Sequence, residues 1–203
     1  MHNSDGFNVI WKESSPSTNA ELKSAVSVMP DGTVLAAVSQ NEGYGQRDHK
    51  WHSAPGLNLT FSILRKYSGE RVFHATDQQL LTMAASLAVL DFLGGYSVEA
   101  SIKMPNDIYI SSNKICGMMI ENGLSGKQMK WSVIGIGLNI NEAEFPDDLP
   151  NPVSLSMLTG RQYEIKKCLS EFLKHFSIRF DAIWTEPETL RKDYEKALIS
   201  LQR

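Results

Sequence analysis

Residues 132–141 read SVIGIGLNIN, and this stretch sets the pattern from which the fold can be worked out. Successive side chains of a β-strand point to opposite faces of its sheet. One face of the stretch then carries only large apolar side chains: Ile134, Ile136, Leu138 and Ile140. The other face carries only glycine and asparagine: Gly135, Gly137, Asn139 and Asn141. We therefore predict a strand whose apolar face lies in the core.

The glycine face of this strand has two interpretations. Glycine weakens a strand and usually marks a place where a ligand or another backbone comes close. Gly135 and Gly137 precede Asn139 on that face, which suits a flat ligand lying over bare backbone with an amide at its rim. A β-bulge or a tightly packed helix would explain the same glycines. The residues alone leave both interpretations open.

Further strands are predicted upstream of this one. Residues 33–40 (TVLAAVSQ) and 57–65 (LNLTFSILR) are rich in β-branched or apolar residues. The stretch at 43–56 between them is polar and contains glycine, which predicts a long loop. Residues 102–122 predict a hairpin, because two apolar runs flank the short polar turn SSN at 111–113.

Helical patterns come before and between these strands. Thr18 and Glu21 have the spacing of a capping box, and Leu22 with Val26 supplies an apolar pair, so a helix should begin at the SPSTN turn. A second, long helix is capped by Thr76 or Asp77 and stopped by Gly94 and Gly95. One face of it carries the apolar residues Leu80, Met83, Leu87 and Leu90.

Two more helices follow an acidic, proline-rich loop at 142–152. The first is marked by the apolar residues Ile165, Leu169, Phe172 and Phe176, and the second by Leu190, Tyr194 and Leu198. Strands grouped in the middle of the chain, with helices before, between and after, predict an α+β fold. We expect a mixed, mainly antiparallel β-sheet covered by helices on one face.

Composition limits the class of protein. With 203 residues, 42% hydrophobic and 21% charged, the chain is an ordinary globular domain, which excludes disorder, collagen and coiled coil. It has neither an apolar run long enough for a membrane span nor a signal-peptide pattern, so we expect a cytoplasmic protein. A net charge of −3 lacks the basic surface of a general nucleic-acid binder. Cys116 and Cys168 are interpreted as reduced core residues.

Two polar stretches carry candidate chemistry. In the loop GYGQRDHKW at 43–51, glycine backbone and cations would surround an anion, although a solvated loop explains the same residues, and the common phosphate-loop patterns are absent. Trp51 at its end either anchors the loop or stacks on a base. In the predicted hairpin, Lys103, Asp107 and Lys114 would hold a magnesium nucleotide, or they form a solvated surface turn. His49 and His52 lack the partners of a zinc pattern, so we predict no metal site made by protein alone.

Taken in order, four stretches resemble the catalytic domain of biotin protein ligases, which biotinylate the carrier domains of carboxylases. They are SPSTNAELK at 15–23, the segment at 39–65, IKMPNDIYISSNKICGMMIE at 102–121 and VIGIGLNIN at 133–141, with NPVSLSMLTG at 151–160 also similar. The resemblance runs from about Ile10 to about Leu198. It implies the fold of biotin and lipoate ligases, which is like that of class II aminoacyl-tRNA synthetases. It also implies formation of biotinyl-AMP from biotin and ATP with Mg²⁺, followed by transfer to a carrier lysine.

The resemblance implies three groups of site residues. Biotin would be bound by Ser17, Thr18, Asn19, Gln40, Gly43, Tyr44, Gly45, Gln46, Lys114, Gly117, Met119 and Gly135, with Gly137 also lining the pocket. ATP would be bound by Arg47, Trp51, Asn106, Asp107 and Asn139, with Mg²⁺ arriving with the nucleotide near Asp107. The catalytic residues would be Lys114, Asp107 and Lys103. The loop at 40–51 would close over the intermediate and exclude water.

The loop departs from the family pattern. Tyr44 stands where an arginine is usual, Gln46 follows where arginine or glutamine is usual, and Asp48 and His49 stand where glycine and arginine or asparagine are common. A phenol replaces neither the charge nor the fork of donors of arginine. Two alternatives to a biotin ligase therefore stay open: a lipoate ligase or octanoyltransferase, and a non-catalytic homologue that binds biotin or the carrier domain. Gln40 and the Ser-Thr-Asn start at 17–19 favour biotin over a plain acyl chain.

The resemblance also bears on domains and partners. We expect residues 1–203 to be the catalytic domain alone, without the N-terminal helix-turn-helix and the small C-terminal β-barrel of some relatives. The expected partner is the biotin carboxyl carrier domain of a biotin-dependent carboxylase, and neither DNA nor a membrane is expected as a partner. A homodimer through an edge strand is left open.

Overall fold

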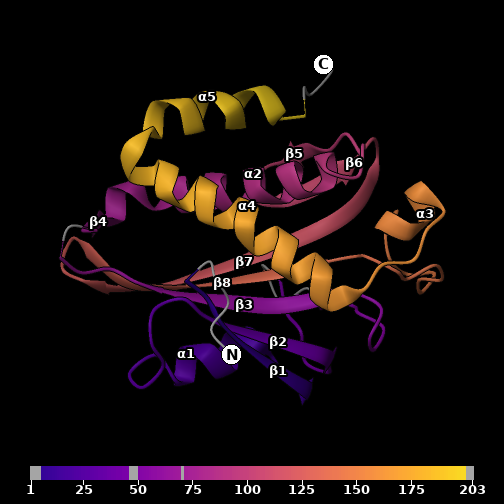
Figure 1. The fold of residues 1–203 in the computed structure, drawn as a ribbon, viewed down its shortest axis with the longest axis horizontal. Helices are drawn as coiled ribbons and strands as arrows, with labels where there is room; N and C mark the ends of the chain where they lie inside the picture. Colours follow the sequence, from indigo (N-terminus) through magenta and orange to yellow (C-terminus); the bar gives the residue numbers. More distant parts are fainter. Residues whose placement is uncertain (1–5, 46–49, 70, 200–203) are drawn as a thin grey trace. The chain divides into compact units, whose positions relative to one another are not determined.

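The structure is a computed structural model that describes residues 6–45, 50–69 and 71–199. It divides into two compact units. Unit 1 comprises Met1–Gln78 with Met118–Leu138, and unit 2 comprises Gln79–Gly117 with Asn139–Arg203. Figure 1 labels the helices and strands of both units.

The strands of unit 1 are β1 (Asn8–Ser15), β2 (Thr33–Gln40), β3 (Leu59–Lys66), β8 (Gln128–Leu138) and the later part of β7 (Asn113–Ser125). They lie in the order β1-β2-β3-β8-β7, and the short β4 (Phe73–His74) pairs with the start of β8. β1 and β2 are parallel, whereas β3 is antiparallel to both β2 and β8. The strands predicted at 33–40, 57–65 and 132–141 are confirmed, although β8 ends three residues early, at Leu138.

Helix α1 (Thr18–Ser24) lies against β2, β3 and β8 within unit 1. Its buried Leu22 joins a cluster with Leu35, Leu64 and Val133, against which Val26 packs, as the predicted apolar pair requires. The predicted capping box is wrong by one residue. Ser17, in extended geometry with a φ of −155°, is the N-cap, and its hydroxyl accepts from the Ala20 backbone N–H. Thr18 is the first residue of the helix and not its cap, so its hydroxyl does not bond the N-terminal backbone N–H groups and can bind other partners.

The strands of unit 2 form a meander rather than the single hairpin that we predicted. β5 (Ser101–Lys103) pairs antiparallel with β6 (Asp107–Ile110), which pairs antiparallel with the beginning of β7. The stretch at 102–110 therefore turns at Met104–Asn106 instead of running as one strand. Pro105 explains the break, because proline has no N–H to donate to a ladder.

Helix α2 (Gln78–Gly94) ends at the glycines, as predicted, but it is buried over more than one face. Leu81, Ala84 and Ala88 are as fully buried as Leu80 and Leu87, while the predicted Met83 and Leu90 are only half-buried. Ser86 near the middle of the helix is also fully buried. The helix therefore packs as a core element, with apolar residues buried on more than the one predicted face.

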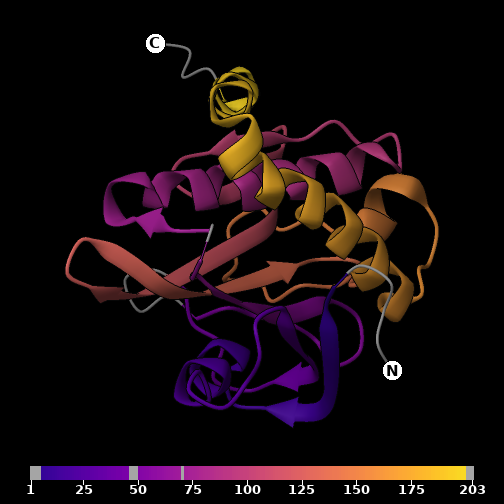
Figure 2. The same cartoon turned by 60° about the vertical axis from the view of Figure 1, so that its left-hand side comes forward.

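Helices α4 (Ile165–Thr185) and α5 (Pro187–Ala197) confirm the two predicted C-terminal helices. α4 (yellow-orange) lies beside α2 (magenta) in Figure 2. Phe172 of α4 packs against Phe92 of α2, and Arg179 binds Asp91 at 2.6 Å. Leu198, predicted to lie in the second helix, instead follows it and forms a parallel bridge with Ile102 of β5. The short α3 (Leu155–Thr159), with Ser154 as its N-cap, was not predicted.

Both cysteines are free and buried, as predicted. The α+β class with a mixed, mostly antiparallel sheet is also confirmed. In the part of the chain that the structure describes, no helix has the length and apolar character needed to span a membrane.

Candidate functional site

The first turn of α1 in unit 1 holds a buried cluster of hydroxyl and amide groups. The Ser62 hydroxyl, fully buried on β3, donates to Asn19 Oδ1 at 2.6 Å. Thr18 Oγ1 lies 2.7 Å from the same hydroxyl. Since Ser62 has one proton and gives it to Asn19, Thr18 is the donor in the second bond. Asn19 Nδ2 in turn donates to the Met119 carbonyl at 3.2 Å, so both ends of this amide are fixed.

Gln40, at the end of β2, completes the cluster. Its Oε1 accepts a hydrogen bond from the Thr18 backbone N–H at 2.9 Å, which leaves the N–H₂ group of the amide (Nε2) available as a donor. Within the described residues nothing accepts a hydrogen bond from this Nε2. A Cβ at Gly43 would lie 2.3 Å from Gln40 Nε2, so glycine at 43 leaves room for the amide. The cluster therefore presents a donor that is oriented by a buried partner.

The glycine face of β8 is filled by side chains of unit 1. A Cβ at Gly135 would lie 2.3 Å from Asn19 Oδ1, and a Cβ at Gly137 would lie 2.2 Å from Trp51 Cε2. At Gly135 the close neighbour is therefore a side chain of α1, as the tightly packed helix requires, and the ligand contacts expected at Gly135 and Gly137 stay predictions. Trp51 acts as an anchor over Gly137, one of the two roles expected for it.

The loop after β2 is held at both described ends. Tyr44 forms an antiparallel bridge with Lys50, and the Trp51 backbone N–H donates to the Gly43 carbonyl at 2.9 Å. Gly45 continues the loop, but the predicted ligand contacts at Gln46 and Arg47, and the altered Asp48 and His49, lie outside the described residues.

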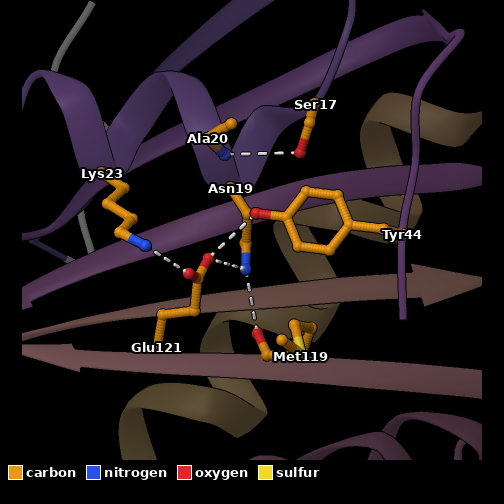
Figure 3. Close-up of polar contacts among 7 residues, drawn as sticks. All are labelled: Ser17, Asn19, Ala20, Lys23, Tyr44, Met119 and Glu121. Atoms are coloured by element: carbon orange, nitrogen blue, oxygen red, sulfur yellow. Dashed lines mark hydrogen bonds and ion pairs between the residues drawn. The ribbon is translucent and has the colours of Figure 1, made fainter. Parts of the chain in front are cut away.

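Tyr44 reaches a carboxylate that the sequence analysis missed. Its hydroxyl donates to Glu121 Oε2 at 3.2 Å, and Lys23 Nζ lies 2.7 Å from Glu121 Oε1 (Figure 3). Burial, with the nearby Glu121 charge, raises the pKa of Tyr44, so the phenol stays a donor at neutral pH. The alternation of β7 would have placed Glu121 on the same face as Met119.

Unit 2 holds a separate charged pair. Lys114 Nζ lies 2.7 Å from Asp107 Oδ1, and each side chain is about a third exposed, at 29% and 30%. The antiparallel register of β6 and β7 puts Asp107 opposite Gly117 and Lys114 opposite Tyr109, with a register shift between Ile108 and Tyr109, so Lys114 reaches Asp107 diagonally across the two strands. Lys103, the third predicted catalytic residue, has its ammonium 4.9 Å from the ring centre of Tyr109. The structure therefore assembles Lys114 with Asp107 and gives Lys103 a different neighbour.

Two of the predicted ATP-binding residues are asparagines buried in the same unit. Asn106 is 7% exposed and Asn139 is 4% exposed. The Asn139 backbone N–H donates to the Ile115 carbonyl, and its Nδ2 donates to the Val153 carbonyl at 3.0 Å. Asn139 Oδ1 is buried with no hydrogen-bond partner among the described residues. A buried acceptor without a donor is costly, so this atom suits a ligand that brings an N–H group.

Metal-binding side chains do not gather in groups of three or more in the described ranges. A lone carboxylate such as Asp107 is nevertheless suited to Mg²⁺ that is carried mainly by substrate phosphates.

Residues 11–139 match the Biotin/lipoate A/B protein ligase family, so the chain belongs to that family. Relatives that it matches include biotin protein ligases, in agreement with the resemblance seen in the sequence. It is 34% identical over 162 residues to the biotin--[acetyl-CoA-carboxylase] ligase of Paracoccus denitrificans, a match covering 75% of this chain and 65% of that protein. It is 30% identical over 155 residues to the bifunctional ligase/repressor BirA of Bacillus subtilis, covering 74% of this chain and 46% of that protein.

A solved structure agrees with these matches. The biotin protein ligase of Aquifex aeolicus in complex with biotin and ATP has a TM-score of 0.79 and 26% identity to this chain. That match covers 95% of this chain and 78% of the other. This chain spans 46% and 65% of the lengths of the Bacillus subtilis and Paracoccus denitrificans relatives.

Proposed function

We propose that this chain ligates biotin to a specific lysine of a biotin carboxyl carrier domain, using ATP and a biotinyl-AMP intermediate. The observation that carries the proposal is the oriented cluster at the start of α1, in which Gln40 keeps a free amide donor beside a fixed Asn19. The biotin ligases of Paracoccus denitrificans and Aquifex aeolicus support the choice of substrate.

The cluster in unit 1 has the chemistry that a biotin ring needs. The ring is a cyclic urea with one strong acceptor oxygen and two N–H donors on an otherwise apolar body. A few fixed polar groups in a small pocket recognise such a ligand, while a plain acyl chain offers them no partner. The hydroxyl of Ser17 and the amide of Gln40 would bind the urea, and Met119 would contact the apolar body.

The groups in unit 2 suit a nucleotide. Lys114 would offset charge as the biotin carboxylate approaches the α-phosphate of ATP. The unpartnered Asn139 Oδ1 would accept a hydrogen bond from an amino group of the base. Asp107 and the triphosphate would together hold Mg²⁺, which would neutralise phosphate charge. Trp51, Asn106 and Lys103 remain predicted contributors to ATP binding or catalysis.

The proposed reaction has two steps. A carboxylate oxygen of biotin forms a bond to the α-phosphorus, while the bond from that phosphorus to the bridging oxygen breaks and pyrophosphate leaves. The amine of the carrier lysine then attacks the acyl carbon of biotinyl-AMP, AMP leaves and the amine loses a proton. That amine is protonated at neutral pH, and Asp107 would accept its proton or orient it.

The test offers the protein ATP and Mg²⁺ with biotin, lipoate or octanoate, with and without a carrier domain, and identifies the products by mass. We expect biotinyl-AMP without the carrier and a carrier heavier by one biotin when it is present. If products form from lipoate or octanoate but not from biotin, the chain would be a lipoate ligase or octanoyltransferase instead. Biotin binding without either product would make the chain a biotin-binding homologue.

A further inference from the structure

Glu121 of β7 joins two parts of unit 1 that are distant in sequence. It accepts hydrogen bonds from Asn19 Nδ2 at 3.3 Å and from the Tyr44 hydroxyl at 3.2 Å, both at Oε2. Its other oxygen accepts from Lys23 Nζ at 2.7 Å. Figure 3 shows the three donors converging on this one carboxylate. Asn19 and Lys23 belong to α1, whereas Tyr44 belongs to the loop after β2.

Only a carboxylate satisfies all three donors at once. An ionised glutamate has two acceptor oxygens with about four lone-pair sites, whereas a glutamine has one acceptor oxygen and adds an N–H₂ group. The Glu121 side chain is 16% exposed, so water competes weakly for it. Hydrogen bonds to a charged, partly buried acceptor are stronger than those between neutral groups.

The three donors differ in importance. Lys23 is 52% exposed, and an exposed ion pair adds little to stability. Asn19 and Tyr44 are the residues placed in the proposed biotin site, and Glu121 is the described side chain that contacts both of them. Through these two bonds α1, the loop after β2 and β7 form one polar network.

We propose that Glu121 is a positioning residue for biotin, a role that rests on the proposed function. It fixes the Asn19 amide and ties Tyr44 to β7, so that the start of α1 and the loop are already in their binding geometry before the ligand arrives. Glu121 acts through these two residues and takes no part in either chemical step. Its loss should therefore weaken biotin binding while leaving the reaction of bound biotin intact.

The kinetic test uses Glu121→Ala, Glu121→Gln and Tyr44→Phe. Lys12→Met is the matched control. Lys12 lies on β1 and pairs with Glu21, which is on the same helix as Asn19, but Lys12 contacts neither Asn19 nor Tyr44. For Glu121→Ala we expect the KM for biotin to rise about tenfold or more, with kcat at saturating biotin within about threefold of wild type. Glu121→Gln and Tyr44→Phe should give smaller rises of KM, and Lys12→Met none. An unchanged KM in Glu121→Ala, or a fall in kcat equal to the loss in kcat/KM, would overturn the proposal.

A second measurement separates this proposal from the proposed function. Backbone hydrogen exchange without ligand should be faster in residues 17–20 and 41–45 of Glu121→Ala than in wild type or Lys12→Met. Glu121→Gln serves in place of Glu121→Ala if the latter is not folded by circular dichroism. If the wild-type protein fails to use biotin, the proposed function falls, and exchange rates alone judge whether Glu121 orders these segments. Equal exchange in Glu121→Ala and Lys12→Met would then reject the positioning role.

Discussion

Gly135 of β8 marks a place where a side chain is excluded so that another residue can be held. The space that its Cβ would fill contains Asn19 Oδ1, the acceptor for the buried Ser62 hydroxyl. Sequence alone pointed to a close approach at this glycine but not to its occupant. The occupant comes from a residue more than a hundred positions earlier, which alternation along a strand cannot reveal.

We predict that Gly135→Ala displaces the Asn19 amide and weakens biotin binding at least about tenfold, because the polar groups left behind lose their partners. The crowding should also lower the free energy of unfolding by about 1–3 kcal/mol. Titration calorimetry and urea denaturation measure the two effects. Gly94→Ala is the control, because a Cβ there meets nothing within 4 Å, so neither a loss of biotin affinity nor a loss of stability is expected. Wild-type affinity in Gly135→Ala would contradict this account of the site.

The charge of Lys114 is the second prediction at the residue scale. Lys114→Met should slow biotinyl-AMP formation by about a hundredfold or more, because a cation beside the developing charge is lost. Single-turnover release of pyrophosphate measures this step. Lys167→Met removes a lysine of the exposed pair with Glu164 and should have wild-type rates. Equal rates in both variants would remove Lys114 from the reaction.

At the scale of secondary structure, local pattern predicted most elements but not their exact limits. Glycine stops, apolar periodicity and β-branched runs located α2, α4, α5, β2, β3 and β8. The meander in unit 2 was missed because the apolar residues before and after Pro105, Asn106 and Asp107 were assigned to one arm of the hairpin, although these three residues are turn formers. Glu121 was missed for a different reason: its partners come from α1 and from the loop, so its role depends on tertiary structure.

The N-cap of α1 can be tested directly. Ser17→Ala removes the acceptor for the Ala20 N–H and should lower the free energy of unfolding by about 1 kcal/mol. Chemical denaturation measures the change. Ser24→Ala at the exposed end of the same helix should cost clearly less, since Ser24 donates only to the Glu21 carbonyl. Equal losses in the two variants would show that the cap position is not special.

For the whole molecule, burial of thiols predicts a loss of stability in alkali. Burial raises the pKa of Cys168 to about 11 from its usual 9.0. The unfolded chain then releases a proton that the folded chain keeps, so stability is complete below pH 9.0 and falls as pH rises toward about 11. Urea denaturation on either side of pH 9.0 should show this slope, and Cys168→Ala should make it shallower. An identical slope in the variant would exclude the thiol as a source.

The pairing of Leu198 and Ile199 with β5 has a consequence for handling the protein. An uncovered strand edge is a template on which other chains add, and natural sheets protect such edges. The Ile199 N–H donates to the Ile102 carbonyl at 2.9 Å, so the segment after α5 occupies hydrogen-bonding positions on β5. Shortening the chain before Leu198 would expose that edge. Truncated preparations are therefore expected to scatter light and precipitate under conditions in which the longer chain stays clear.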